Sequence, residues 1–366
     1  MGKSRRLLAV AGFLALSVIS AACSSNGGGG NSNQPAFSGA PLTGAGSTFA
    51  APVYEQWGKD FNGIESQAQV NYQAIGSGGG VDAFTKQTVQ FGASDAPLQP
   101  DQSSALPSDA VEIPTMLGGV AVAYNANGVP DGLKLDARTI AEIFLRKVTT
   151  WNDPAIASLN PGVSLPNAAI KPVHRSDDSG TTFVFTNWLS QGSDEWKKQV
   201  GANTTVQWPA GEAGKDGSDG VAAYMKQTQG SVGYISYDYA VANGFGSAAV
   251  EAPDGSFVAP SPQSISAAGA QLSLPVSPGT NVLNASSSGA YPIATTTYVM
   301  IYKHQTDRDV AQTLVDFFTY GLNQGQRLLT QLNYAPLPDA IRQQAVKALT
   351  HISVNGKSIK PSPGIT

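Results

Sequence analysis

The sequence predicts an α/β fold, because strand-like and helix-like segments alternate along most of its 366 residues. Segment 70–75 alternates apolar and polar residues as a half-buried strand does. Segment 118–124 is a nearly continuous apolar run, which is typical of a strand covered on both faces. Val53, Trp57 and Phe61 recur every four residues and predict an amphipathic helix.

Further segments of both kinds continue this alternation. Segments 169–174 and 298–302 are predicted strands, and a further predicted strand over 89–94 ends just before Asp95. A second amphipathic helix near the C-terminus is predicted by the spacing of Val310, Leu314, Val315, Phe318 and Leu322. With 41% hydrophobic residues, 40 Gly and 23 Pro, the chain is a globular protein with many turns.

The charge and the scarcity of metal-binding residues exclude several functions. Only 13% of residues are charged, against a usual share of about 25%. The net charge is −4, and it becomes about −7 without Lys3, Arg5 and Arg6, so we expect no nucleic-acid partner. A single Cys excludes a disulfide scaffold and a zinc cluster, and three scattered His do not favour a metal site. We therefore expect neither a metal nor a cofactor.

The pattern of the N-terminus predicts an export signal followed by a membrane anchor. Residues 1–22 combine three basic residues with an apolar run of 16 residues, which is shorter than the roughly 20 residues that span a bilayer. The small residues before Cys23 resemble a bacterial lipobox; an ordinary cleavage site beside an incidental Cys is the alternative. Residues 23–40 are rich in Gly, Ser and Asn and predict a flexible linker. We expect a protein lipid-anchored at Cys23 on the outer face of the cytoplasmic membrane.

Familiar enzyme motifs are missing or incomplete. No G-x-S-x-G occurs, and Gly356-Lys357-Ser358 lacks the first Gly of a phosphate-binding loop. Segment 244–249 fits a loose dinucleotide fingerprint, but Pro253 follows too soon for the helix that such a motif requires. We therefore expect a binding protein and not an enzyme.

Three Gly-rich segments combine features that suit an oxyanion. Segments 44–49, 76–80 and 178–182 each place Gly beside Ser or Thr, just before a predicted helix. A helix N-terminus exposes unpaired N–H groups and a partial positive charge, Gly allows close approach, and hydroxyls add donors. Taken singly, each Ser or Thr could instead be an ordinary helix cap.

Charged residues beside these segments sharpen the hypothesis. Arg175 could donate to the anion while Asp177 orients its guanidinium, or the two could form a plain surface ion pair. Asp95 could accept the proton that phosphate carries near neutral pH and sulfate lacks, which would reject sulfate. An ordinary turn or cap role before Pro97 is the alternative for Asp95.

Residues from about 42 to 355 resemble the periplasmic-type phosphate-binding proteins of bacterial phosphate ABC importers, the PstS family. The resemblance is specific because separated motifs occur in one order. These motifs are Thr43–Phe49, Tyr72–Gly79, Phe91–Pro97, Trp151–Ala157, Arg175–Phe185, Gly230–Tyr234 and Tyr334–Pro338.

The resemblance implies a phosphate site, a fold and partners. The implied ligands are Thr48, Phe49 through its backbone N–H, Ser77, Asp95, Arg175, Ser179, Gly180 and Thr181. The implied fold has two α/β lobes of the type II solute-binding class, with a cleft between lobes joined by two crossover segments. The lobes would be 41–122 plus 296–366 and 123–295. The implied partners are inorganic phosphate and the permease subunits of an ABC importer, and we expect a monomer.

Two positions depart from the family pattern. Asp178 stands where the family usually has Gly, and Gly78 where it often has Ser. The first adds a negative charge beside the site. A binding protein for another oxyanion, an extracytoplasmic phosphatase and an added adhesin or signalling role remain the alternatives to phosphate delivery.

Overall fold

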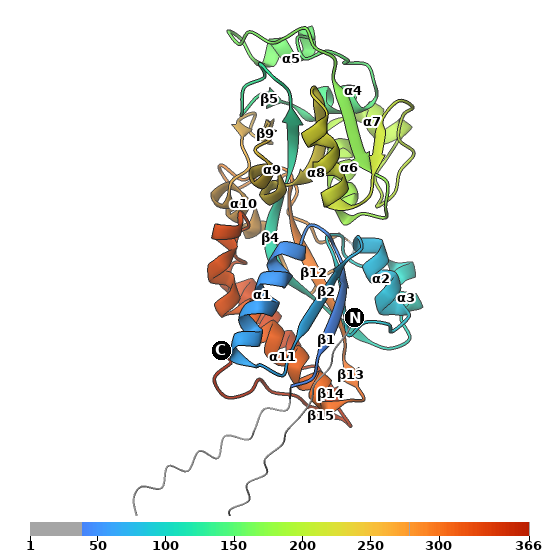
Figure 1. Cartoon of the computed structure of the whole chain (residues 1–366), viewed down its shortest axis with the longest axis vertical. Coiled ribbons are helices and arrows are strands. Elements are labelled where there is room, and N and C mark those ends of the chain that lie inside the picture. Colours follow the sequence, from blue (N-terminus) through green and yellow to red (C-terminus); the bar gives the residue numbers. More distant parts are fainter. Residues whose placement is uncertain (1–38, 278, 366) are drawn as a thin grey trace, which may run out of the picture. The chain divides into compact units, whose positions relative to one another are not determined.

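A nine-stranded sheet runs through the part of the chain that this computed structural model describes, residues 39–277 and 279–365 (Figure 1). The strands follow the order β2-β1-β3-β12-β4-β8-β6-β7, and β9 also pairs with β4. Their bounds are β1 Leu42–Gly46, β2 Val70–Ala74, β3 Phe91–Ser94, β4 Ala110–Asn125, β6 Lys171–Arg175, β7 Ala213–Lys215, β8 Ser231–Ser236, β9 Gly246–Ser247 and β12 Ala294–Tyr302.

Strand β4 connects two groups of parallel strands. Up to Gly119 it pairs antiparallel with β12, and from Val120 onward it pairs antiparallel with β8. Beyond β12, strands β3, β1 and β2 are parallel; beyond β8, strands β6 and β7 are parallel. Parallel neighbours require long crossover connections, which explains the helices that separate these strands in the sequence.

Helices cover both faces of the first group of strands (Figure 1). Helices α1 (Ala51–Ile64) and α11 (Arg308–Leu322) contact each other on one face, where Trp57 and Phe61 are fully buried. Helix α2 (Ser77–Thr85) contacts β1 and β3, and a separate apolar cluster there includes Phe84 and Met300. Strand β12 is accordingly buried along its whole length, whereas the edge strand β2 is largely exposed.

The second group of strands is covered in the same way. Helices α4 (Ala137–Phe144) and α6 (Gly180–Gly192) contact each other, with Phe144 and Phe185 in edge contact. Helix α8 (Gly217–Gln227) contacts β6 and β8, and Val221 and Met225 belong to a cluster with Val173. The layered arrangement is that of an α/β protein.

The remaining elements are short or peripheral. Two three-stranded sheets have the orders β11-β10-β5 and β13-β14-β15. Their strands are β5 Lys134–Leu135, β10 Ala249–Glu251, β11 Phe257–Val258, β13 His304–Gln305, β14 Ser353–Val354 and β15 Lys357–Ser358. The other helices are α3 Pro100–Ala105, α5 Pro154–Leu159, α7 Asp194–Gln199, α9 Tyr237–Asn243, α10 Pro262–Ala268 and α12 Asp339–Leu349, with 3-10 turns Gly269–Gln271 and Gln324–Leu332.

The expected elements are largely confirmed, with shifted ends. The strand expected over 169–174 begins instead at Lys171, because Ala169 lies opposite Thr150 in an isolated bridge and the N–H of Ile170 donates to the carbonyl of Thr149. The strand expected over 118–124 is the second half of the 16-residue β4. Both predicted amphipathic helices form and bury their apolar faces.

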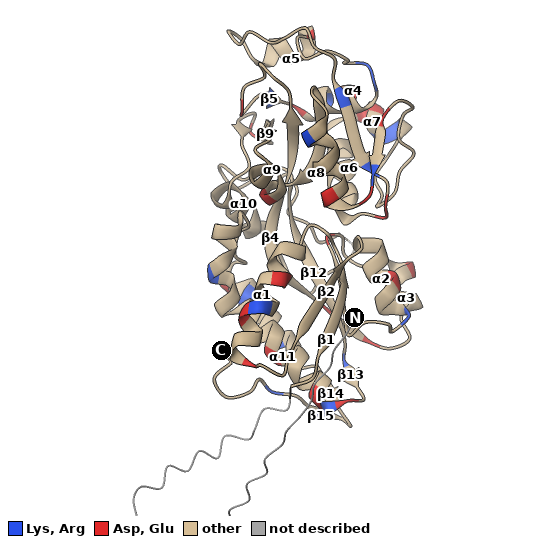
Figure 2. Ribbon diagram, in the orientation of Figure 1, with Lys and Arg blue, Asp and Glu red and all other residues tan. Residues whose placement is uncertain are grey.

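The expectations for the N-terminus are not tested by the residues that the structure describes. The signal peptide 1–22, Cys23 and all but the end of the linker 23–40 lie outside them. Within 39–277 and 279–365, no helix combines the length and apolarity needed to cross a bilayer. Lys and Arg are interspersed with Asp and Glu along this part of the chain (Figure 2).

Candidate functional site

The predicted anion-binding residues lie where strands and helices of both groups meet. Thr48 and Phe49 follow the carboxyl end of β1, and Asp95 follows that of β3. Ser77 is the first residue of α2. Arg175 ends β6, and Ser179, Gly180 and Thr181 form the start of α6. In open α/β sheets, ligands bind at the carboxyl ends of the strands.

Asp95 is the centre of a buried hydrogen-bond network. Its Oδ1 accepts from the hydroxyls of Ser47 at 2.6 Å and Thr297 at 2.7 Å. Its Oδ2 accepts from the hydroxyl of Thr181 at a longer 3.4 Å, and its N–H donates to Ser77 Oγ at 3.2 Å. The segment after β1, strand β12 and helix α6 therefore each supply a donor to one carboxylate, and α2 accepts a bond from the backbone of the same residue.

Burial and these hydrogen bonds shift the pKa of Asp95 in opposite directions. Burial raises the pKa of Asp95, and the hydrogen bonds from Ser47 and Thr297 and the charge of Arg175 oppose that rise. Oδ1 already accepts two short bonds, whereas Oδ2 has only the long one, so Oδ2 is the oxygen better able to accept a further O–H. The alternative role as a helix cap is wrong, because α3 begins at Pro100 with Gln99 as its cap.

Arg175 and Asp177 form a bidentate ion pair. Nε of Arg175 donates to Oδ1 of Asp177 at 2.6 Å, and Nη2 donates to Oδ2. The two side chains are only 2% and 12% exposed, so the pair exists but is not the surface pair considered as an alternative. The guanidinium has five N–H groups, so further donors can bind an anion.

Asp177 is held ionised and oriented by its neighbours. Burial alone would raise the pKa of Asp177, but the hydrogen bonds from Arg175 and its charge outweigh burial, and the pKa lies below its usual value. The N–H of Gly217, at the start of α8, also donates to Asp177 Oδ1 at 3.1 Å. This geometry suits a residue that positions Arg175.

The start of α6 packs directly against Ser77 and Asp95. A Cβ placed on Gly180 would lie 2.4 Å from Ser77 Oγ and 2.9 Å from Asp95 Cβ. Thr181 is buried beside them and reaches Asp95 with its hydroxyl. Segments from the two groups of strands are thus in contact at the predicted site.

The three Gly-rich segments differ in part from the expected loops. Gly44 to Gly46 belong to β1, and α2 already begins at Ser77, so Gly78 to Gly80 are helical. Glycines occur within this strand and this helix because the two pack closely: a Cβ on Gly80 would lie 2.4 Å from Gly46 Cα. These glycines therefore bring α2 onto β1, besides exposing backbone to a ligand.

Helix capping accounts for one of the candidate hydroxyls. Ser179 accepts the N–H of Thr182 at 3.2 Å and so caps α6. The N–H groups of Gly180 and Thr181 lie earlier in this first turn, where a helix offers no intrahelical partner. Ser77 has another role, because its hydroxyl accepts from Asp95 and not from its own helix.

Sequence reasoning missed a fourth helix start at this place. Gly217 and Ser218 open α8, and Ser218 shares a 2.9 Å hydroxyl–hydroxyl bond with Thr48. The N–H of Ser218 also donates to Thr48 Oγ1 at 3.3 Å. The pair Gly217-Ser218 after β7 repeats the Gly-Ser signal of the other segments and could have been found.

Phe49 contributes differently from the other predicted residues. Its ring is fully buried in edge contact with Tyr334, whose hydroxyl donates to the carbonyl of Phe49. Its side chain is therefore part of the core, and any contact with a ligand would come from its backbone, as the resemblance implied.

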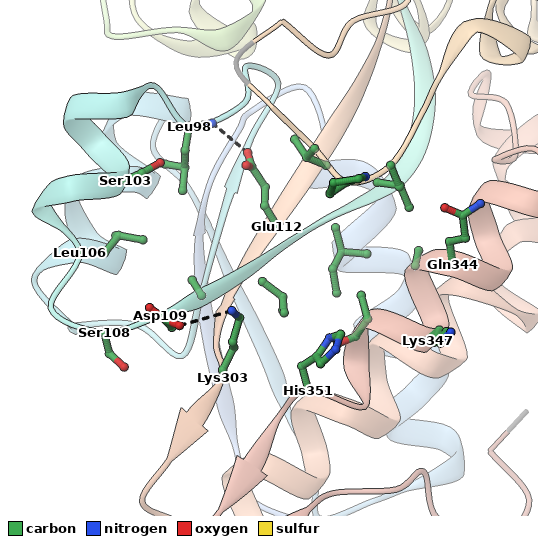
Figure 3. A pocket seen from close by; sticks show the side chains of 18 of the residues that line it. Leu98, Ser103, Leu106, Ser108, Asp109, Glu112, Lys303, Gln344, Lys347 and His351 are labelled. Carbon is green, nitrogen blue, oxygen red and sulfur yellow. Dashed lines mark hydrogen bonds and ion pairs between the residues drawn. The ribbon is translucent and has the colours of Figure 1, made fainter.

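A hollow of about 360 Å³ adjoins the site. It is lined by residues of α2, the segment 94–102, Phe183 and the segment 202–204, and Ser77 and Gly78 are among them. A larger groove of about 980 Å³ lies elsewhere, between the start of β4, Leu274–Val276 and α12 (Figure 3). That groove contains none of the predicted ligands, and its lining mixes acidic groups such as the half-buried Glu112 with basic ones such as Lys303 and Lys347.

The described residues contain no group of three or more His, Cys, Asp or Glu placed to hold a metal. The donors at the site are instead hydroxyls, helix-start amides and one guanidinium, together with an acceptor carboxylate. This combination suits a tetrahedral oxyanion.

The arrangement is the fold of periplasmic binding proteins. A family model described as "PBP superfamily domain" matches residues 26–320. The solved structure of a high-affinity periplasmic phosphate-binding protein, PfluDING, bound with phosphate, is similar to this chain with a TM-score of 0.69. The two are 22% identical, and the similarity covers 83% of this chain and 92% of that one, which establishes the α/β fold.

Sequence comparison defines the family more closely. The chain is 40% identical over 306 residues to the phosphate-binding protein PstS of Xylella fastidiosa, covering 83% of each chain. It is 39% identical to PstS of Pasteurella multocida, covering 83% of this chain and 88% of the relative. The chain therefore belongs to the PstS family of phosphate-binding proteins, as its motifs predicted, and this is a family of binding proteins and not of enzymes.

Proposed function

We propose that this protein binds inorganic phosphate between the two groups of strands and delivers it to the permease of an ABC importer. Its relatives are named phosphate-binding proteins, and the predicted ligands occupy one place in the fold. The proposed ligands are Thr48, Phe49, Ser77, Asp95, Arg175, Ser179, Gly180 and Thr181, with Asp177 positioning Arg175.

The contact between Asp95 and Thr181 carries this proposal. It joins a carboxylate after β3 to a hydroxyl of α6, next to the guanidinium of Arg175. Phosphate near neutral pH has both the charge that Arg175 compensates and a proton that Oδ2 of Asp95 can accept. Sulfate would present only acceptor oxygens to this carboxylate, so we expect it to be rejected.

Buried charge is needed to explain tight binding of so small a ligand. Phosphate has five heavy atoms, and a ceiling of about −1.5 kcal/mol per atom allows roughly −7.5 kcal/mol, or a few micromolar. The overall charge of the chain opposes an anion at long range, since acidic residues outnumber basic ones. Affinity beyond this ceiling would come from charge-assisted bonds to Arg175 and the helix starts.

We propose that the two groups of strands belong to two lobes, 41–122 plus 296–366 and 123–295. Strand β4 changes partner at Gly119 and Val120, and the chain returns to the first group at Ala294, which supports a division within three residues of these boundaries. Phosphate would contact both lobes and so favour the closed arrangement by its higher affinity for it.

We also propose an extracytoplasmic protein anchored by a lipid on Cys23, after removal of residues 1–22. The sequence around Cys23 supports this part of the proposal. Replacing Cys23 with Ala should move the protein from the membrane fraction to the soluble fraction. An unchanged distribution would contradict the anchor.

Titration calorimetry tests the binding function. The full chain should bind phosphate, and excess sulfate should not displace it. Equal binding of sulfate would favour a carrier for another oxyanion. Release of phosphate from a phosphate ester by the purified protein would favour a phosphatase instead.

A further inference from the structure

A direct contact joins Gly78 and Asp178 across the proposed cleft. Gly78 is the second residue of α2, and Asp178 lies in the turn between β6 and α6. The N–H of Gly78 donates to the carbonyl of Asp178 at 3.0 Å. Neither residue is among the proposed ligands, yet each is the direct neighbour of one, Ser77 and Ser179.

The side chain of Asp178 occupies the space where a side chain at position 78 would lie. A Cβ on Gly78 would be 2.0 Å from Cγ, 2.1 Å from Oδ2 and 2.5 Å from Cβ of Asp178. Rotation of the carboxylate cannot relieve the contact with Cβ, which is fixed to the backbone. A side chain at 78 and Asp at 178 therefore exclude each other in this arrangement.

The same contact extends along the segment before α2. Gly76 has φ 82°, a conformation that favours glycine, and a Cβ there would lie 2.6 Å from Asp177 Oδ2 and 2.9 Å from the carbonyl of Asp178. The backbone of 76–78 thus lies flat against residues 177 and 178. This close approach holds the start of α2 against the start of α6.

Solvent exposure and the position of the Asp178 carboxylate together explain how a negative charge is tolerated near an anion site. It lies over the first turn of α2, where the helix carries a partial positive charge. The charge of Asp178 is therefore partly compensated by the opposite side of the cleft. The contribution of α2 is present only while the two sides are together.

We propose that Gly78 and Asp178 form a closure contact that sets how long a bound anion is retained. This inference rests on the proposed function, because it adds to the anion ligands a second feature that controls how fast phosphate leaves the same site. The contact can form only when Ser77 and Gly180 are also in contact, so it stabilises the closed arrangement and slows release of the ligand.

Four variants of the full chain test the proposal: Gly78→Ser, Asp178→Gly, the double variant, and Gly63→Ser as a matched control. Gly63 is a helical glycine of α1 at which a Cβ would meet nothing within 4 Å. The measurements are phosphate dissociation by stopped flow, hydrogen exchange of the amide at position 78, and circular dichroism to verify folding.

We expect Gly78→Ser to release phosphate at least about tenfold faster than wild type, and Gly63→Ser to match wild type. Asp178→Gly should release it several-fold faster, without adding bulk that could disturb folding. In the double variant the clash is absent, so its rate should fall from that of Gly78→Ser to that of Asp178→Gly. Wild-type release from Gly78→Ser, or a double variant as fast as Gly78→Ser, would overturn the closure contact.

Hydrogen exchange separates this inference from the function on which it rests. If the wild-type chain bound no phosphate, the proposed function would fail, and the exchange data would still decide the contact. The amide at position 78 should be protected in wild type, exposed by Gly78→Ser and protected again in the double variant. Equal exchange in all the variants would refute the contact.

Discussion

The hydroxyl groups of Thr48 and Ser218 lie 2.9 Å apart although 170 residues separate them in the sequence. Thr48 follows β1, and Ser218 belongs to the first turn of α8, so this bond joins the two groups of strands. Thr48 is also a proposed phosphate ligand. The bond therefore fixes the orientation of a ligand hydroxyl from the opposite side of the cleft.

Removing the hydroxyl of Ser218 should weaken phosphate binding without unfolding the protein. A neutral hydrogen bond contributes about 0.5–1.5 kcal/mol net, so Ser218→Ala should weaken binding roughly two- to thirteenfold. Titration calorimetry measures the change, with exposed Ser266→Ala on α10 as the control. Equal affinities of Ser218→Ala and wild type would show that Thr48 needs no partner.

Replacing Asp95 with Asn should narrow the difference between phosphate and sulfate affinities. Asn offers N–H donors where Asp95 offers acceptor oxygens, so sulfate would no longer meet a repelling carboxylate. The variant keeps the size of the side chain and an oxygen for the donors Ser47 and Thr297. Competition calorimetry gives the ratio, and an unchanged ratio would mean that discrimination arises elsewhere.

The fold was predictable where apolar residues recur on a single face of a helix or strand. The spacing of Val53, Trp57 and Phe61 determines a helix because all three side chains are buried on one face of α1. The start of β6 was predicted less well, since Ala169 and Ile170 are strand-like in composition but pair with the separate segment 149–150. Such pairing depends on tertiary contacts that local alternation does not encode.

The candidate site was predictable from short segments that share one chemistry. Gly with Ser or Thr before a helix is recognisable in a sequence for two reasons. The unpaired N–H groups of a helix start require an acceptor, which a hydroxyl or a bound anion supplies, and Gly allows the backbone to approach that acceptor closely. The position of Asp95 at the end of β3 was also predictable. The contact of Ser218 with Thr48, and the packing of Gly80 on Gly46, could not be derived, because they depend on how distant segments pack.

Replacing Arg175 with Ala should abolish most phosphate binding and destabilise the fold. The anion would lose its guanidinium, and Asp177 would remain largely buried without its cation, which typically costs about 3–5 kcal/mol. In wild type the pKa of Asp177 is lowered, so the pair contributes stability above the unfolded pKa that is lost as pH falls through the folded pKa.

The loss of stability in Arg175→Ala should therefore be largest near pH 7 and shrink below about pH 4, where Asp177 is protonated even in the unfolded chain. Urea unfolding at pH 7 and pH 3 measures both values. Near-normal phosphate affinity in this variant would restrict Arg175 to a structural role.

Glu112 should make the protein less stable as the pH rises. Burial raises its pKa from 4.5 to about 7, although its Oε1 accepts the N–H of Leu98 at 2.9 Å (Figure 3). A raised carboxyl pKa means that the folded state favours the neutral form. The unfavourable effect is absent below pH 4.5 and grows as the pH rises toward 7.

Glu112→Gln should remove this pH dependence. At about 1.4 kcal/mol per pH unit, the variant should be up to about 3 kcal/mol more stable than wild type at pH 8 and no more stable at pH 4. Exposed Glu251→Gln on β10 is the control. A gain of the same size at both pH values would show that ionisation of Glu112 is not responsible.

Adding one methyl group at Gly180 should block phosphate binding more than it affects stability. The Cβ of Gly180→Ala would lie 2.4 Å from Ser77 Oγ and 2.9 Å from both Cβ and N of Asp95, so the start of α6 could not approach α2 and β3. Separation of the two sides relieves the clash without disturbing the core of either, and alanine favours the helix that begins at this position. We expect at least a hundredfold loss of phosphate affinity with an unfolding midpoint close to that of wild type.

Gly220→Ala in α8, where a Cβ makes only ordinary contacts at 3.5 Å or more, is the matched control. Wild-type affinity in Gly180→Ala would mean that phosphate binds without the close contact between α6, Ser77 and Asp95.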